Sequence, residues 1–196
     1  MSIKTKVKEH FTSNPLKGHL ERIPIKSHRD FSPQNTVGNE SSKDIQLGHG
    51  LNFRKFTLED LDECAILFKE VFSAGPWYDE WVSLDQSRNY LGELVENPVF
   101  KGFVMCEGSK IVAVCLGHRR SWWRGKEFFL DELFVENSSQ GRGIGSKTVN
   151  DLLKVLFEEK YNRVILLTNK GIPAEVFYLK KGFYNNEKRT VMVLEM

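Results

Sequence analysis

Residues 128–147 read FFLDELFVENSSQGRGIGSK, an apolar strand-like run followed by a polar link and a glycine-rich turn. Three glycines stand on alternate positions between residues 141 and 145, and glycine adopts positive φ and lets backbone approach a ligand closely at little steric cost. Apolar residues then recur at helical spacing, which predicts a helix from Ile144 to about residue 159. Because a helix start presents unpaired N–H groups and a partial positive charge, this segment suits a phosphate or pyrophosphate.

Two familiar phosphate-binding motifs do not fit the spacing of this turn. The dinucleotide fingerprint G-x-G-x-x-G, begun at Gly141, needs glycine at the position of Ser146. A P-loop needs lysine directly after its last glycine, whereas Ser146 separates Gly145 from Lys147. The pattern that does fit, starting at Gln140, is Gln/Arg-x-x-Gly-x-Gly/Ala. A turn that merely links a strand to a helix is the structural alternative.

This pattern and its flanks resemble the acetyl-CoA loop of the GCN5-related N-acetyltransferase (GNAT) superfamily. A second motif, Ala-x-x-Phe-Tyr-x-x-x-Gly-Phe, occupies residues 174–183 and follows in the order and separation typical of that superfamily. The resemblance covers roughly residues 51–196. It implies acetyl-CoA as the donor co-substrate, with a strand backbone along the pantetheine arm and the loop around the pyrophosphate. The residues implied are Leu133, Phe134, Val135, Gln140, Gly141, Arg142, Gly143, Ile144, Gly145 and Ser146.

The sequence departs from the superfamily pattern at one position. Members often carry asparagine three residues before the alanine that corresponds to Ala174, where it contacts the pantetheine arm. Here that position is Gly171. Asn169, two residues earlier, is the candidate replacement, and the sequence does not fix whether it reaches the same place.

The resemblance also implies a general acid at Tyr178. A phenol with an ordinary pKa near 10 stays protonated at neutral pH, so it can protonate a thiolate that leaves a thioester. The alternative is that the aromatic residues of this motif are all core residues. We prefer the core role for Phe177 and Phe183 and the catalytic role for Tyr178, because two independent motifs agree.

A base is expected at Asp131 or Glu132, two adjacent acids in the middle of an apolar strand. A carboxylate can attract an ammonium group and take its proton, directly or through water. Strand alternation places Asp131 on the face of Leu133 and Glu132 on the face of Phe134, unless a bulge intervenes. Similarity to the aminoglycoside 6′-N-acetyltransferases favours Asp131, and the choice between the two acids stays open here.

The acceptor is predicted from aromatic and acidic residues in two segments, residues 76–81 and the Trp-Trp pair at 122–123. Aromatic rings with acids suit a small cationic amine of the aminoglycoside or polyamine kind, although rings that cap the core are an equal alternative. We therefore expect acetyl transfer to a primary amine, with a protein N-terminal or lysine acetyltransferase, or a non-catalytic CoA-binding module, as alternatives. The predicted acceptor residues are Trp77, Tyr78, Asp79, Trp122 and Asp131.

Composition limits the other classes of function. Charged residues make up 28% of the chain but the net charge is only +2, so we expect no nucleic-acid partner. The chain has neither a membrane-length apolar run nor a signal-peptide core, which predicts a cytoplasmic protein without a membrane partner. Its three cysteines lack metal-ligand spacing, so we expect buried thiols and no metal. A homodimer is compatible with these features.

The element order predicts an α+β, or mixed α/β, domain at residues 51–196, preceded by a flexible or loosely attached extension at residues 1–50. We expect a GNAT-like, mostly antiparallel sheet of six to seven strands, splayed at the cofactor site and flanked by about four helices. The short apolar run 163–168 is typical of a central strand covered on both faces. Residues 189–194 are predicted to supply the last strand.

Overall fold

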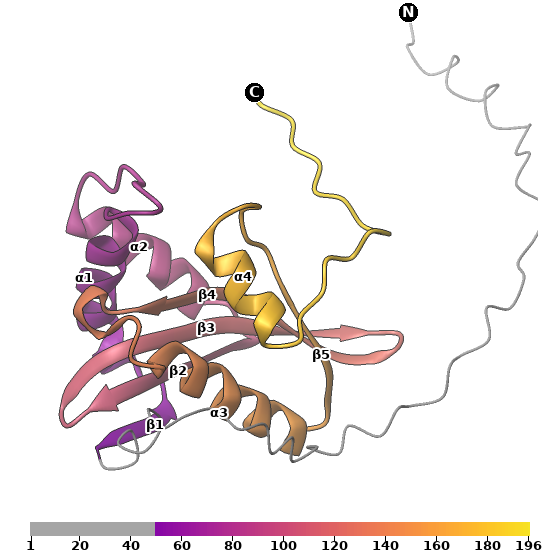
Figure 1. The fold of residues 1–196 in the computed structure, drawn as a ribbon, viewed down its shortest axis with the longest axis horizontal. Coiled ribbons are helices and arrows are strands. Elements are labelled where there is room, and N and C mark those ends of the chain that lie inside the picture. Colours follow the sequence, from indigo (N-terminus) through magenta and orange to yellow (C-terminus); the bar gives the residue numbers. More distant parts are fainter. Residues whose placement is uncertain (1–49) are drawn as a thin grey trace, which may run out of the picture. The chain divides into compact units, whose positions relative to one another are not determined.

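The computed structural model describes residues 50–196, so the extension predicted for residues 1–50 lies, apart from Gly50, outside the described residues. The described part is a mixed α/β domain, as the sequence predicts (Figure 1). Its strands are β1 (Leu51–Lys55), β2 (Phe100–Glu107), β3 (Lys110–Trp122), β4 (Gly125–Val135) and β5 (Tyr161–Leu166). Its helices are α1 (Leu61–Phe72), α2 (Leu84–Val95), α3 (Ile144–Glu158) and α4 (Pro173–Lys180), with short 3-10 turns at Leu58–Asp60 and Asn137–Ser139.

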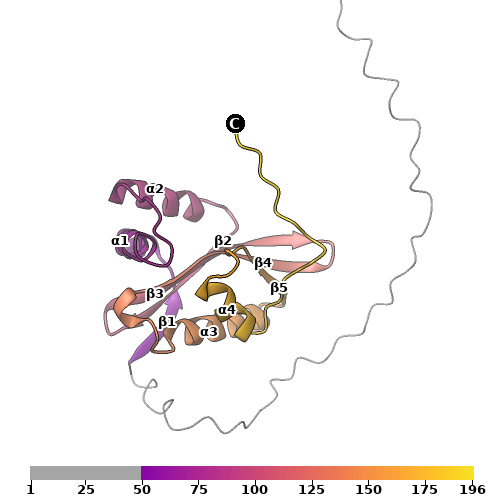
Figure 2. The same ribbon diagram turned by 45° about the horizontal axis from the view of Figure 1, so that its top comes forward.

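The strands form one sheet in the order β1-β2-β3-β4-β5, in which only the β4–β5 pair is parallel. Helices α1 and α2 cover one face of the sheet, and α3 and α4 cover the other (Figure 2). Each face has its own apolar cluster, because the side chains of successive strand residues point to opposite faces. All three cysteines are buried and unpaired, as expected. Within residues 50–196, no helix is long and apolar enough to cross a membrane.

Two strand predictions were wrong. Residues 163–166 of the predicted run 163–168 belong to β5, which lies at the edge of the sheet, and their apolar side chains are only half-buried. Leu167 lies beyond the strand and is exposed. Residues 189–194 form no strand, so the described sheet has five strands rather than six or seven. Val191 and Met192 are instead exposed on an extended tail. High β propensity does not create a strand where no neighbouring strand pairs with it.

A β-bulge interrupts the pairing of the two central strands. Leu116 pairs with Glu132 while the next residue, Gly117, pairs with Leu130, so Asp131 is the extra residue on β4. A bulge changes the direction of the side chains on one strand, so strict alternation fails at this point. Gly117 allows the close approach that the bulge needs. A Cβ atom added there would lie 2.2 Å from the carbonyl oxygen of Phe129.

Replacement of Gly117 by alanine is therefore expected to destabilise the domain. The new methyl group would meet backbone as well as the ring of Phe128, and neither can move away cheaply. We expect the free energy of unfolding in urea to fall by about 3 kcal/mol. Gly92→Ala is the matched control, because nothing lies within 4 Å of a Cβ in that helical position. This control should gain up to about 1 kcal/mol, and equal effects of the two variants would contradict the prediction.

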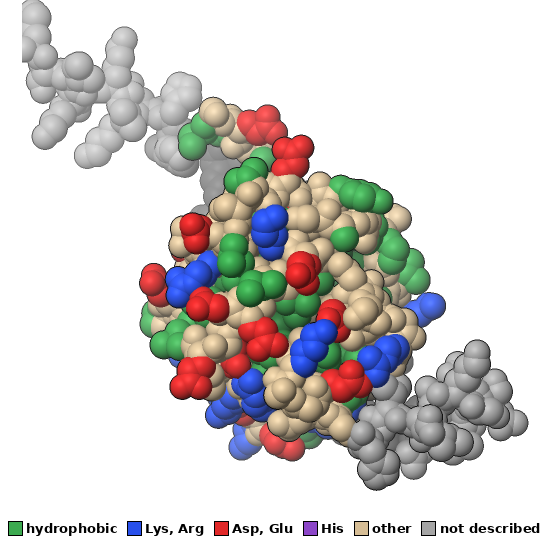
Figure 3. All heavy atoms as spheres, turned by 90° about the vertical axis from the view of Figure 1, so that its left-hand side faces the viewer, with side chains coloured by type: hydrophobic (Ala, Val, Ile, Leu, Met, Phe, Trp, Pro, Cys, Tyr) green, Lys and Arg blue, Asp and Glu red, His purple; other side chains and the backbone are tan. Residues whose placement is uncertain are grey.

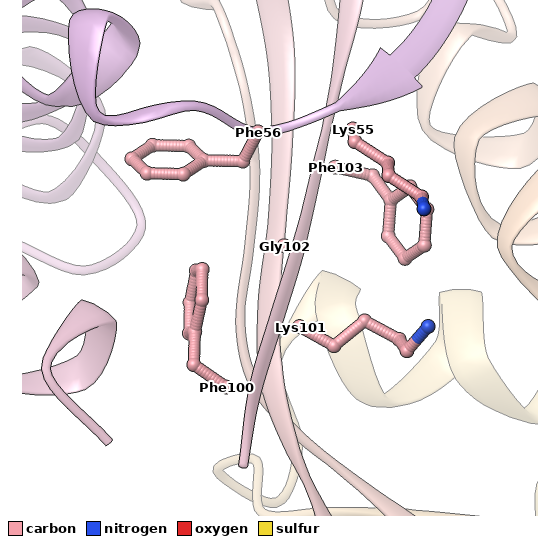
Figure 4. A pocket seen from close by; sticks show the side chains of 6 residues that line it. All are labelled: Lys55, Phe56, Phe100, Lys101, Gly102 and Phe103. Atoms are coloured by element: carbon pink, nitrogen blue, oxygen red, sulfur yellow. The ribbon is translucent and has the colours of Figure 1, made fainter. Parts of the chain in front are cut away.

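A surface pocket lies beside the end of β1, around Gly102 of β2 (Figure 4). Phe56 and Phe100 line one side of the strand, and Lys55, Lys101 and Phe103 line the other. Lys101 is held by Glu159 at 2.6 Å. The order of the strands places this pocket at the opposite edge of the sheet from β5, so it is separate from the site described next.

Candidate active site

The sheet opens between β4 and β5. The parallel pairing of these strands ends at Leu130 and Leu166, whereas β4 continues to Val135. The backbone of residues 131–135 therefore keeps N–H and C=O groups on its β5 side that no β5 residue pairs with. An unpaired strand edge of this kind can bind an extended chain that carries amide groups.

The glycine-rich turn leads from the same end of β4 into α3. Gly141 and Gly143 have φ of 73° and 81°, a conformation in which side chains are strained, and Gly143 is the N-cap of the helix. No side chain caps the helix. The first N–H groups of α3 therefore remain available for an anion.

Two cations close to this turn, Arg142 and Lys147, are each paired with an acid. Arg142 is bonded to Glu107 at 2.6 Å, and Lys147 to Asp151 at 2.6 Å. Figure 3 views the molecule from the side toward which β2 and β4 run. Acidic and basic side chains are interspersed on this face. An anion at the turn would thus be held mainly by backbone N–H groups.

Several predicted cofactor residues can contribute only main-chain atoms. Phe134 and Ile144 are buried in the apolar clusters. Gly145 has no side chain, and a Cβ atom added there would lie within 4 Å of Val135 and Phe177. Asn169 is exposed in the loop between β5 and α4. Its neighbour Thr168, which sequence reasoning missed, has a buried hydroxyl without a hydrogen-bond partner among the described residues. This hydroxyl is free to bond a ligand or a water molecule in the opening.

Tyr178 lies in α4 and packs against the apolar cluster that contains Leu133 and Cys115. Its ring makes edge contacts with Phe177 and Phe183. Burial raises the pKa of Tyr178 well above its usual value, and the charges of Cys115 and Glu132 add to this shift. The phenol therefore stays protonated at neutral pH, beside the opening between β4 and β5.

The bulge brings Asp131 and Glu132 to the same face of the sheet, which corrects the predicted alternation. Leu116 packs in the cluster under α1 and α2, so Glu132, its partner across the strands, faces these helices. His118 follows on the same face of β3, and its Nδ1 lies 2.7 Å from Asp131 Oδ2. Both carboxylates therefore face the α1–α2 side, whereas Leu133 faces the other.

Glu132 has the more unusual surroundings of the two acids. Tyr90 of α2 donates a hydrogen bond to its Oε1 at 2.5 Å. Burial raises the pKa of Glu132 to about 7, the Tyr90 hydrogen bond acts in the opposite direction, and the charges of Asp131 and Asp79 raise it further. A carboxyl group with a pKa near 7 can exchange protons at neutral pH.

Removal of the Tyr90 hydroxyl should raise the pKa of Glu132 further. The hydrogen bond favours the ionised carboxylate, so Tyr90→Phe is expected to move the midpoint of its titration upward by about one pH unit. The measurement is an NMR titration of the protein with ¹³C-labelled glutamate side chains. Tyr161→Phe, at the far end of β5, is the control and should leave this midpoint unchanged. A downward shift in Tyr90→Phe would contradict the assignment of the hydrogen bond.

The predicted acceptor residues separate into two groups. Asp79 lies close enough to Glu132 to raise its pKa, and Tyr78 is exposed next to it. Trp77, by contrast, packs on Phe72 at the core, which is the alternative role considered for it. Trp122 lies four residues beyond His118 on β3, roughly 13 Å farther along the strand. Only a molecule of about that length could contact both Asp131 and Trp122.

Sequence reasoning missed Tyr90 and His118. Tyr90 is part of an amphipathic helix, and its role appears only when α2 lies over β4. His118 is isolated in the sequence, and only the pairing of β3 with β4 places it beside Asp131. Trp81, which packs on Tyr90, is a further candidate because its indole N–H is buried without a partner among the described residues.

Solved structures with this fold include three instructive neighbours. A protein from Clostridium difficile 630, described as a possible acetyltransferase, has a TM-score of 0.65 at 16% identity, covering 75% of this chain and 99% of its own. An aminoglycoside acetyltransferase from an uncultured soil metagenomic sample, solved with sisomicin, has a TM-score of 0.57 at 18% identity, covering 74% and 95%. A ribosomal-protein-alanine N-acetyltransferase from Brucella melitensis biovar Abortus 2308 has a TM-score of 0.58 at 14% identity, covering 74% and 99%. These likenesses establish the fold.

A comparison with curated proteins found no match. The model of the acetyltransferase (GNAT) family, in contrast, matches residues 59–183. The matched region begins just before α1 and ends after α4, so it contains the glycine-rich turn, the two acids of β4 and Tyr178. The chain therefore belongs to the GNAT acetyltransferase family.

Proposed function

We propose that this acetyltransferase uses acetyl-CoA to acetylate a primary amine on a small cationic molecule. The carrying observation is the group of carboxylates of Asp79, Asp131 and Glu132, which lies on the α1–α2 face of β4 beside the opening of the sheet. Acids gathered at one place attract a cationic amine and lower the cost of bringing it out of water. The same group contains a carboxyl that can accept a proton near neutral pH.

The residues around the opening suit acetyl-CoA. The unpaired edge of residues 131–135 can pair with the amides of the pantetheine arm, and the N–H groups at the start of α3 can bind the pyrophosphate. The buried hydroxyl of Thr168, which has no hydrogen-bond partner among the described residues, can donate a further hydrogen bond from the β5 side of the opening. When bound, acetyl-CoA supplies an activated acetyl thioester.

Each catalytic group then has a distinct role. Glu132 takes the proton that the acceptor ammonium must lose before its nitrogen can attack the acetyl carbonyl. Asp131, fixed by His118, attracts and orients the amine. Main-chain N–H groups of residues 133–135 polarise the carbonyl, and Tyr178 donates its phenolic proton to the leaving thiolate. This assigns the base to Glu132, whereas similarity alone favours Asp131.

A protein N-terminal or lysine acetyltransferase is the second candidate, and a CoA-binding module without catalysis is the third. Against the third, the chain has both an acid and a base candidate around the opening. Against the second, Asp79, Asp131 and Glu132 are gathered at one place, which suits a compact polycation. The fold itself does not separate these, since neighbours named for aminoglycosides and for a ribosomal protein have similar TM-scores.

The test is a thiol-release assay with acetyl-CoA against aminoglycosides, polyamines, amino acids and peptides. We expect turnover with the polycationic small molecules and little with single amino acids. Turnover with peptides alone would favour the protein acetyltransferase. CoA binding in calorimetry without thiol release from any amine would favour the non-catalytic module.

A further inference from the structure

The closed end of the β3–β4 hairpin is a second surface of unusual composition. Residues 119–126, here called the hairpin end, read Arg-Arg-Ser-Trp-Trp-Arg-Gly-Lys and contain no acid. Strands β3 and β4 pair to the last residue, Trp122 with Gly125. Figures 1 and 2 both show this end projecting beyond the helices.

The acids nearest to the hairpin end neutralise only one of its four cations, Arg120. Glu127 is buried, accepts two hydrogen bonds from Arg120, and lies 3.3 Å from Arg163. Glu159 of α3 is held by Lys101 at 2.6 Å. The side chains of Arg119, Arg124 and Lys126 are exposed. The surface of the hairpin end is therefore locally cationic, although the chain as a whole is nearly neutral.

The two tryptophans lie at the apex of this cationic surface. Trp123 is in the turn itself, and its side chain is 75% exposed. The guanidinium of Arg124 lies 4.3 Å from its ring centroid, and that of Arg120 lies 5.0 Å from the ring of Trp122. Single exposed apolar residues are common. Two adjacent indoles at the apex of a hairpin, each with an arginine on it, are a more specific arrangement.

We propose that the hairpin end docks on an anionic lipid surface. Indole rings partition to the boundary between lipid headgroups and acyl chains, and arginine and lysine bind the lipid phosphates around them. The apex position favours lipid over single-stranded nucleic acid. A narrow turn presents one ring outward, which can enter a lipid layer, whereas binding to a nucleic-acid strand requires a groove with successive stacking platforms.

The experiment is co-sedimentation of the full chain with vesicles of equal parts phosphatidylcholine and phosphatidylglycerol, compared with vesicles of phosphatidylcholine alone. We expect binding to the anionic vesicles, stronger at low salt, with a blue shift of tryptophan fluorescence. Arg119→Glu with Arg124→Glu should weaken binding by roughly 25-fold or more. Trp123→Ala should weaken it by roughly tenfold or more.

Matched controls lie elsewhere on the domain. Lys180→Glu with Lys188→Glu removes two exposed cations, and Phe157→Ala removes an aromatic side chain that is 70% exposed on α3. Both control variants should bind vesicles as the parent does, and thermal melting checks that every variant folds. No binding to either vesicle, or undiminished binding by the hairpin-end variants, would overturn the proposal. Hairpin-dependent binding that is tighter for a single-stranded oligonucleotide than for the vesicles would also overturn it. Because the assay does not use acetyl transfer, its result is independent of the proposed function.

Discussion

Replacement of Glu132 by glutamine should lower kcat by about 10²- to 10⁴-fold, the contribution typical of a general base. Glutamine keeps the size of the side chain and can still accept the hydrogen bond of Tyr90, but it cannot take a proton. The rate of the parent should rise with pH through about 7, since the base acts when ionised and burial places its pKa at about 7. The variant should lose this rise. The measurement is kcat against pH with the best amine found in the thiol-release assay.

The same pKa shift gives a second readout that does not depend on any substrate. The pKa of Glu132 is about 7 in the folded protein and about 4.5 when unperturbed, so the folded state holds a proton that the unfolded state releases. The parent should therefore lose stability as pH rises from about 4.5 to 7, by at most about 3 kcal/mol. Glu132→Gln should lack this loss.

The corresponding substitution of the neighbouring acid separates the two assignments. In the proposed roles Asp131 attracts the acceptor and does not take its proton, so Asp131→Asn should raise KM for a cationic amine and keep the rise of kcat with pH. The midpoint of that rise should fall below the parent's, because the charge of Asp131 raises the pKa of Glu132. If Asp131→Asn removed the pH dependence and Glu132→Gln kept it, Asp131 would be the base. The sequence-based preference would then be right and the assignment made from the structure would be wrong.

The parts of the site that sequence reasoning predicted are local in the chain. The glycines at 141 and 143 indicate positive φ, and the apolar spacing after Ile144 predicts α3. Both the turn and the helix depend on neighbours within a few residues. The strand before the turn and the helix that carries Tyr178 were predicted for the same reason. The family match covers all of these segments.

The parts that sequence reasoning missed depend on contacts between distant segments. The bulge at Asp131 arises from the approach of Gly117 on another strand, so strict alternation assigned Asp131 to the wrong face. The hydrogen bond from Tyr90 spans 42 positions, and no local pattern marks it. Strand β5 was predicted to be central because its apolar run is short and unbroken. The apolar residues of this strand are half-buried, and the sequence pattern alone does not show whether a further strand pairs with its outer edge.

Replacement of Tyr178 by phenylalanine should lower kcat by about 10²- to 10⁴-fold and leave KM for acetyl-CoA nearly unchanged. Phenylalanine keeps the ring in its contacts with Phe177 and Phe183, so the packing of α4 is preserved. Only the hydroxyl is lost, and with it the proton for the leaving thiolate. Thiol release at saturating acetyl-CoA measures the change, and calorimetry with CoA checks that the donor still binds.

The chain offers a control for this substitution in Tyr184, which lies six residues later and is exposed. Tyr184→Phe removes the same hydroxyl from a similar region and should leave kcat unchanged.

The pH profile gives a further check. Because burial raises the pKa of Tyr178, deprotonation of this phenol should not affect the rate below about pH 10. The rise in rate near pH 7 belongs to Glu132, so it should persist in Tyr178→Phe. Full turnover by Tyr178→Phe would remove the acid role and leave the residue as part of the core. A lowered rate with the pH rise intact would place the acid at Tyr178 and the base at a different residue.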